Sequence, residues 1–304
     1  MDAPTTSAAP EIICAGELLI DLLSTDYAED FRHADHYRRL PGGSPANLAT
    51  NLARLGQRVA LVATVGQDDA GALLIDHAAA AGVSTAGLSR VEEPTTLILV
   101  TKSRAVGNFE AYRGADARIE PRQFAAVDRT ALRLFHTTAF ALSREPARSS
   151  ILTTARELGR AGVRLSIDAN YAGKIWPDRG EARRVIRDYL AGGALAKFSD
   201  VDYHRLFGEE VDTPEAAARR IRDLGAAVVF LTLGERGCYV LHEGGCFTLP
   251  ARPVDVVDTT GAGDAFWSGV LSAHLEGLGW EVCARNGREM AERKITGRPS
   301  GTLG

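Results

Sequence analysis

The sequence predicts an α/β protein built on a mainly parallel sheet that is covered by helices on both faces. Strand-like and helix-like segments alternate along most of the 304 residues. The strands are continuously apolar, as in AAVVFLTL at residues 226–233, which is typical of parallel strands buried on both faces. No repeat, low-complexity tract or Pro/Ser-rich linker divides the chain. We therefore expect one domain over residues 1–304.

The expected elements follow one another along the chain. Residues 11–20 form a strand that ends at the carboxylate of Asp21. The next helix covers residues 44–56, with Ser44 as the N-cap, Pro45 in the first turn and Gly56 at the end. Further strands are expected at residues 59–65, 163–168, 196–201 and 226–233. Further helices are expected at residues 70–81, 149–161, 181–190, 214–224 and 261–276.

Two stretches depart from this alternation of helices and strands, residues 24–40 and residues 95–116. Apolar and polar residues alternate there around polar turns, and Gly107–Asn108 is the candidate turn in the second stretch. We expect antiparallel strands outside the main sheet. They would form a small β lid over the active face.

Composition narrows the function and the location. The chain has 35 basic and 39 acidic residues, a net charge of −4 and no basic block, so nucleic acid is not expected as a partner. The N-terminus lacks the basic start and apolar core of a signal peptide, and no apolar run approaches the roughly 20 residues of a membrane span. The four cysteines form no CxxC pair, which predicts reduced thiols without zinc. We expect a cytoplasmic protein that binds no membrane.

Residues 257–271, VDTTGAGDAFWSGVL, carry the clearest sign of chemistry. Gly261, Ala262 and Gly263 begin a predicted helix, where small residues leave the backbone N–H groups open to an anion. Asp264 follows in the first turn. An Asp in that place can simply balance the helix dipole, but it needs no three small residues before it. In phosphoryl transfer Asp264 would orient and deprotonate a hydroxyl, with the helix N-terminus lowering the pKa of its carboxyl.

Other enzyme classes with glycine-rich or short catalytic motifs fit less well. The sixth position of a dinucleotide fingerprint starting at Gly261 is Phe266, and only 40 residues follow Asp264. No glycine loop precedes Lys102–Ser103, and neither HEXXH nor GxSxG occurs. The sequence therefore disfavours dehydrogenases, P-loop NTPases and those hydrolases.

A second segment, residues 40–66, has the composition of a sugar site. Gly42 and Gly43 precede the helix and would let a sugar approach the backbone. Asn47, in the first turn, offers a donor and an acceptor to vicinal hydroxyls. In isolation, a plain helix entry with a solvated Asn explains the segment equally well.

Together the two segments resemble the signatures of the PfkB (ribokinase-like) carbohydrate kinases. GGSPANLA, with Gly56 and Gly66 at matching distances, is similar to the N-terminal signature, and DTTGAGDAFWSGVL is similar to the C-terminal one. The resemblance runs from about residue 12 to near the C-terminus. It implies a doubly wound α/β domain with a β lid, ATP as the donor, Mg²⁺ and a sugar acceptor.

The resemblance also implies roles for single residues. Asp264 would be the catalytic base and Gly261, Ala262 and Gly263 the anion hole. Asp202 would place Mg²⁺. Whether a monovalent cation such as K⁺ is needed near Asp258 stays open. The implied sugar contacts are Asp21, Gly42, Gly43, Asn47 and Arg113. The implied nucleotide contacts are Ser199, Thr232, Gly234 and Gly237.

The segments GELLIDLL, TTLILV, YRGADARI and SDVDYHRLFG look most like fructokinases, so fructose is the expected acceptor. The main alternative is 2-keto-3-deoxygluconate, whose kinases share the Tyr112–Arg113 pair. Arg113 would then hold a carboxylate, although an ordinary surface Arg is an equal explanation. Ribose and nucleoside kinases come next. The exposed strand edges of the lid are compatible with a homodimer.

Three departures from the family pattern keep a second class of function open. Ala172 stands where relatives have Arg, which opposes an acidic or phosphorylated acceptor. Ser199 and Asp202 stand where the family has Asn and Glu, so the carboxylate is one methylene shorter. A catalytically silent sugar-binding regulator on the same fold is therefore the alternative to a kinase.

Overall fold

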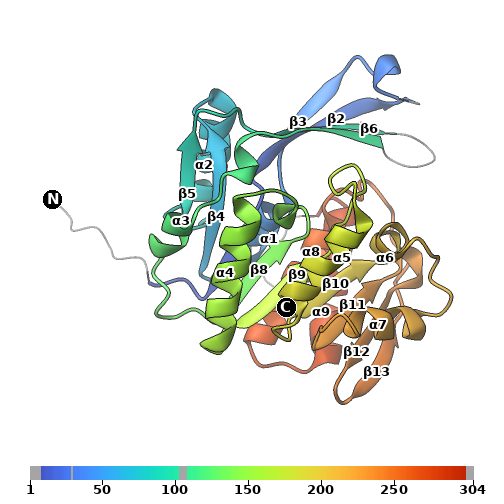
Figure 1. Ribbon diagram of the computed structural model, residues 1–304. Helices are drawn as coiled ribbons and strands as arrows, with labels where there is room; N and C mark the ends of the chain where they lie inside the picture. The colour runs from blue at the N-terminus through green and yellow to red at the C-terminus, as the bar shows by residue number, and fades with distance from the viewer. Residues whose placement is uncertain (1–7, 29, 103–107, 299–304) are drawn as a thin grey trace.

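A large, mainly parallel sheet forms the centre of the molecule (Figure 1). The computed structural model describes residues 8–28, 30–102 and 108–298. Within these ranges, β12 pairs antiparallel with both β11 and β13 at one edge, and the other neighbours pair in parallel. The strand order is β13 (Gly245–Leu249), β12 (Cys238–His242), β11 (Val228–Thr232), β10 (Leu195–Ser199), β9 (Arg164–Asp168), β8 (Leu134–Thr138), β1 (Ile12–Ala15), β4 (Val59–Gly66) and β5 (Leu88–Val91).

Helices cover both faces of this sheet because alternate residues of each strand point to opposite sides. In β1, Ile13 and Ala15 belong to one buried core and Ile12 and Cys14 to the other. The first core includes residues of α3 (Pro121–Ala125), α4 (Ala147–Arg160), α5 (Arg179–Leu190), α6 (Asp200–Phe207) and α7 (Pro214–Arg222). The second includes residues of α1 (Ser44–Arg54), α2 (Asp69–Ala80), α8 (Ala262–Leu275) and α9 (Trp280–Ile295).

This two-sided covering confirms the predicted fold class, a doubly wound α/β sheet. The other expected elements are present, with ends shifted by at most two residues. None of the helices in the described ranges is long and apolar enough to cross a membrane.

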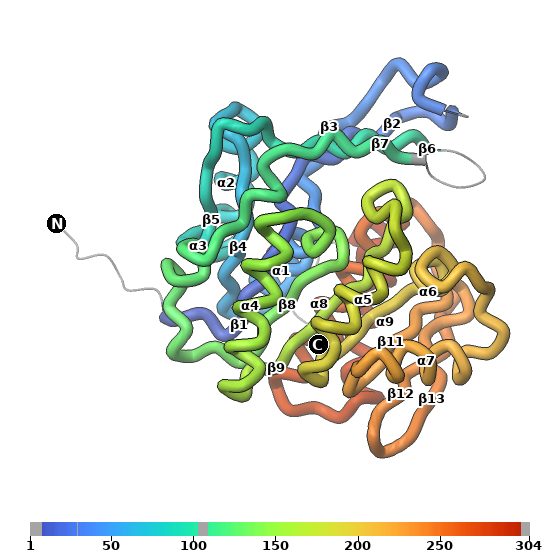
Figure 2. The backbone as a smooth tube through the Cα atoms, in the orientation of Figure 1, coloured from blue at the N-terminus to red at the C-terminus, as the bar shows by residue number. Residues whose placement is uncertain are grey.

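A separate small sheet projects from the main body as a lid (Figures 1 and 2). In the described residues its strands follow the order β3 (Tyr37–Gly42), β2 (Leu19–Tyr27), β6 (Leu97–Lys102) and β7 (Asn108–Tyr112). The outer pairs β2–β3 and β6–β7 are antiparallel as expected, but β2 and β6 pair in parallel. The chain reaches β6 only after passing through the main domain, so no hairpin joins the two. The candidate turn at Gly107–Asn108 falls partly outside the described residues.

Two sequence predictions at the start of the chain are wrong. Residues 11–20 are not one strand: β1 ends at Ala15 and β2 begins at Leu19, which takes the chain from the main sheet into the lid. Both strands begin with buried apolar residues, so hydrophobicity does not mark the break. Ser44 is not the N-cap either, because Gly43 holds that position with φ 98° and Ser44 is the first helical residue.

Candidate active site

One large cavity lies between the lid and the carboxyl ends of the parallel strands. Its volume is about 1270 Å³, and it is lined by every site residue predicted from the sequence except Gly42 and Arg113. In doubly wound sheets, ligands bind outside the carboxyl ends of the strands, and ligand sites are deep and concave. The fold therefore brings the two predicted motifs, at residues 42–49 and 258–271, to one place.

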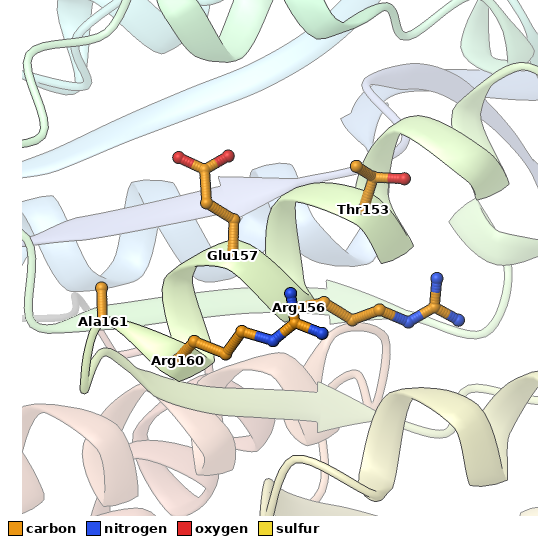
Figure 3. Close-up of a pocket in the computed structure, with 5 residues that line it drawn as sticks. All are labelled: Thr153, Arg156, Glu157, Arg160 and Ala161. Carbon is orange, nitrogen blue, oxygen red and sulfur yellow. The ribbon is translucent and has the colours of Figure 1, made fainter.

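A second hollow, on the surface of α4, lacks these properties (Figure 3). Its lining residues Thr153, Arg156, Glu157, Arg160 and Ala161 all come from one helix and its end. Their side chains do not converge on a common point in Figure 3. The cavity beneath the lid is therefore the candidate active site.

The carboxylate of Asp264 is held by the helix that carries the other motif. Ser44 Oγ donates to Asp264 Oδ1 at 2.6 Å, and Asn47 Nδ2 donates to Asp264 Oδ2 at 2.9 Å. The Asn47 amide nitrogen, expected to bind sugar hydroxyls, is thus already engaged with the carboxylate. The two motifs form one constellation instead of two separate half-sites.

The pKa of Asp264 moves opposite to the sequence prediction. Burial raises the pKa of its carboxyl above the ordinary value, although the hydrogen bonds from Ser44 and Asn47 and the charge of Lys197 oppose this. The helix N-terminus was expected to lower the pKa, but removal from water outweighs it. Asp264 is therefore a stronger base than predicted.

Asp21, on β2 of the lid, faces the same cavity. Burial, and then the charge of Asp264, raise its pKa to about 7. Gly42 makes room for it, since a Cβ on Gly42 would lie 2.1 Å from Asp21 Oδ2. A Cβ on Gly43 would lie 2.2 Å from the carbonyl oxygen of Glu17. Contacts within the protein therefore explain both glycines without a sugar.

Glu17, which the sequence analysis missed, supports Asp264 indirectly. It is buried in the cavity wall, and its carboxylate accepts from Ser44 N at 3.3 Å and from Thr138 Oγ1 at 2.9 Å. Burial raises its pKa to about 8. Glu17 thus fixes the first residue of α1, whose hydroxyl in turn holds Asp264.

Arg113 does not line the cavity. Its side chain is 2% exposed and forms an ion pair with Asp116. It also donates to Ser143 Oγ at 2.5 Å and lies 4.2 Å above the centre of the Phe140 ring. Arg113 therefore does not extend towards the acceptor as expected. Its charge is neutralised by Asp116 inside the protein, at the base of the lid. Phe140, against which it packs, does line the cavity.

Lys197 and Asp168 form a buried ion pair that the sequence analysis did not single out. Lys197 Nζ donates to Asp168 Oδ2 at 2.6 Å, and both residues line the cavity. Burial alone would lower the pKa of Lys197, but the charges of Asp168, Asp202 and Asp264 outweigh it and raise that pKa. The sequence signal was a lone Lys within the apolar strand LAKFS.

Asp202 is committed to hydrogen bonds within the protein. Its Oδ2 accepts from Ser199 N at 2.8 Å and Ser199 Oγ at 2.7 Å, and its Oδ1 accepts from Tyr171 N at 2.8 Å. The described residues contain no group of three or more His, Cys, Asp or Glu side chains that could hold a metal ion. These residues therefore fit an Mg²⁺ ion that is coordinated mainly by nucleotide phosphates and water.

The other end of the cavity suits a nucleotide. Thr232 ends β11, and Gly234 and Gly237 lie in the turn that leads to β12. Apolar side chains that can contact a base line the same cavity, namely Val254, Val256, Ala291 and Ile295.

Comparisons with known proteins show the family of the chain. The family model "pfkB family carbohydrate kinase" matches residues 9–301. The chain is 35% identical over 267 residues to the ATP-dependent 6-phosphofructokinase of Thermoanaerobacterium thermosaccharolyticum, covering 88% of this chain and 82% of that protein. It is 30% identical over 270 residues to fructokinase-2 of Solanum habrochaites, covering 88% and 82%.

Among solved structures, Halothermothrix orenii fructokinase superposes with a TM-score of 0.79 and 31% identity, covering 91% of this chain and 98% of that one. The chain therefore belongs to the pfkB family of carbohydrate kinases, which phosphorylate sugars with ATP, and has the ribokinase-like fold.

Proposed function

We propose that this kinase phosphorylates an uncharged sugar, and that fructose is the acceptor. The observation that carries the proposal is the charge of the lid side of the cavity. The lid residues that line it are Leu19, Asp21, Ile98, Val100 and Phe109, with no Lys or Arg among those described. Recognition of a phosphate or carboxylate relies on charge-assisted bonds from cations. A neutral polyol needs only hydrogen-bonding groups and an apolar wall.

Two competing acceptors are disfavoured by the same feature. Fructose 6-phosphate would bring a dianion towards Asp21, and Ala172 in the cavity wall offers it no donor side chain. 2-Keto-3-deoxygluconate would need a cation for its carboxylate, and Arg113 is already paired with Asp116. Lys174 ion-pairs with Glu110 at 2.7 Å on the exposed side of the same region.

The proposed reaction uses few protein groups. The γ-phosphoryl group of ATP would lie over the backbone N–H groups of residues 261–263, where the N-terminus of α8 favours negative charge. Asp264 would accept a hydrogen bond from the sugar hydroxyl and then its proton, as the oxygen–phosphorus bond to the sugar forms and that to ADP breaks. Mg²⁺, bound with ATP, would supply charge neutralisation at the phosphates. The lid would exclude water.

The test is release of ADP from Mg-ATP with five acceptors: fructose, fructose 6-phosphate, 2-keto-3-deoxygluconate, ribose and adenosine. We expect kcat/KM to be highest for fructose. A higher value for fructose 6-phosphate or the keto acid would refute the proposed acceptor. Sugar binding without ADP release from any of the five would favour the catalytically silent regulator.

We also propose a homodimer formed through the lid. Three large hydrophobic side chains exposed in the described part of the chain belong to it: Tyr27, Phe31 and Tyr112. Exposed apolar side chains beside unpaired strand edges favour association. Light scattering after gel filtration should give twice the 32.5 kDa mass of the chain. A monomer mass at micromolar concentration would refute the dimer.

A further inference from the structure

Lys197 is a fully charged side chain in the centre of the cavity wall. It lies on β10, directly opposite Asp168 on the neighbouring strand β9. The residues are 5% and 2% exposed, and the ion pair joins them at 2.6 Å. Both line the cavity. The sheet itself therefore fixes this ammonium group, with no loop involved.

The ammonium group retains bonding capacity. A lysine ammonium has three N–H donors, and the described residues account for one hydrogen bond from Lys197, to Asp168 Oδ2. Buried charges in proteins are normally paired and hydrogen-bonded at each donor. Two donors are thus left to a group that enters the cavity.

The anion turn lies within reach of these donors. A Cβ placed on Gly263 would lie only 3.1 Å from Lys197 Nζ. The glycine thus brings the turn into contact with the ammonium group, which a larger residue would push away. An anion bound by the N–H groups of residues 261–263 would therefore also contact the ammonium group of Lys197.

The surrounding charges make a cation necessary at this point. The groups that face Lys197 are the carboxylates Asp168 on β9, Asp202 on α6 and Asp264 on α8. Cys238 on β12 is a further neighbour, and burial raises the pKa of its thiol. His136 on β8 is also buried, and its pKa is lowered to about 3 by burial and by Lys197. It is therefore uncharged at neutral pH. Without Lys197, a phosphoryl group would face these carboxylates with no buried side-chain cation beside it.

We propose that Lys197 is a further catalytic residue, which donates a hydrogen bond to the phosphoryl group as it passes over residues 261–263, and that Asp168 is the positioning residue that holds it. The oxygen–phosphorus bond to ADP breaks as the bond from the sugar oxygen forms, and the hydroxyl proton goes to Asp264. Lys197 stays protonated and stabilises the charge on the equatorial oxygens. The role concerns the phosphoryl group, so it holds for any sugar acceptor.

Stability alone does not account for the pair. Buried ion pairs are frequently no more stabilising than apolar residues of the same volume. The other buried side chains of β9 and β10 are apolar, apart from the uncharged Ser166. The Lys197–Asp168 pair lies where the two strands end in the cavity, which indicates a catalytic role.

The test compares Lys197→Met with the wild type, using whichever sugar the wild type phosphorylates best. We expect kcat to fall at least about 100-fold, the size of loss seen on removal of one oxyanion donor. KM for the sugar and the affinity for ADP should change less than about threefold. Lys174→Met, which alters a half-exposed lysine paired with Glu110, is the control and should keep its kcat.

Three further readouts separate catalysis from folding. Affinity for the transition-state mimic formed by ADP, aluminium fluoride and sugar should fall in Lys197→Met far more than affinity for ADP. Methylammonium should restore part of the kcat of Lys197→Ala, and Lys197→Arg should keep more activity than Lys197→Met. Asp168→Asn should lose less kcat than Lys197→Met.

A folded Lys197→Met with kcat within about threefold of the wild type would overturn the proposal. Should that variant fail to fold, unchanged affinity of Lys197→Ala for the mimic, together with no rescue of its kcat by methylammonium, would overturn it as well. Failure of fructose as a substrate leaves this test intact, because the acceptor is chosen by the wild-type protein.

Discussion

The two ends of the cavity differ in charge. At the lid end, Asp21 and apolar residues of the lid line the wall, with no described cation. Near the N-terminus of α8, the cavity holds Lys197, and Lys294 Nζ would lie 4.0 Å from a Cβ on Gly261. A kinase must hold a neutral hydroxyl in contact with an anionic phosphoryl group. The distribution of charge orients the two substrates, and Asp264 lies where the two regions meet.

Loss of Asp264 should have the largest effect, because it joins the two regions. Asp264→Asn keeps the shape and can still bond Ser44 but cannot accept a proton. We expect kcat to fall by at least ~10²-fold, with ADP affinity within about threefold by calorimetry. Turnover near the wild-type rate would remove Asp264 from the mechanism.

A cation placed at the lid end should reduce the difference in charge between the two regions of the cavity. Ala172→Arg puts a guanidinium into the cavity wall and should raise the ratio of kcat/KM for fructose 6-phosphate to that for fructose by about tenfold. Ala172→Gln, similar in length but uncharged, is the control. An equal change in both variants would mean that size, not charge, governs the acceptor.

Asp21 should make the stability of the protein depend on pH. Its ordinary pKa of 3.8 rises to about 7 in the fold, so between these values the folded protein binds more protons than the unfolded one. Ionisation of Asp21 therefore lowers stability as pH rises from about 4 to 7. We expect Asp21→Asn to gain Tm over the wild type as pH rises through that window, in scanning calorimetry. A constant difference between the two from pH 5 to 8 would contradict the raised pKa.

The same variant should lose sugar binding at high pH. If the ionised carboxylate of Asp21 accepts the sugar hydroxyl bonds, wild-type kcat/KM for fructose should rise between about pH 6 and 8. In Asp21→Asn the rise centred near 7 should disappear, and KM should increase roughly tenfold. Persistence of that rise in the variant would assign it to another group.

The smallest effect concerns monovalent cations. Asp258 faces cations of the chain itself: Arg38 of the lid at 3.6 Å, and Lys102 and Lys294, whose charges contribute to its lowered pKa. These charges already balance the carboxylate of Asp258, where the sequence left the need for K⁺ open. We expect kcat to change less than about twofold when K⁺ is replaced by tetramethylammonium at constant ionic strength. Several-fold activation by K⁺ would contradict this.

The sequence predicts local features well. The turn at residues 261–263 and Asp264 could be identified because small residues before a helix and an acid in its first turn are adjacent in the chain. Asp21 could be predicted because it follows an apolar run. Most helices could be located from their apolar period and their glycine ends.

Features that depend on distant residues could not be predicted. Arg113 is neutralised by Asp116 and held by Ser143, 30 residues away, so its burial is not visible in the segment YRGAD. Lys197 interrupts an apolar strand, and only strand pairing brings Asp168 opposite. The direction of the Asp264 pKa shift follows from burial, which is a property of the whole fold. The charged helix α9 and the short strand β8, with His136 in its centre, lack a clear apolar period.

The central claim is that the lid end of the cavity accepts a neutral sugar. The most direct measurement gives the wild-type kinase equal concentrations of fructose and fructose 6-phosphate with limiting Mg-ATP, and resolves the products by phosphorus NMR. The account predicts that at least about 90% of the transferred phosphate appears on fructose, a tenfold ratio of kcat/KM. Fructose bisphosphate as the main product would contradict it.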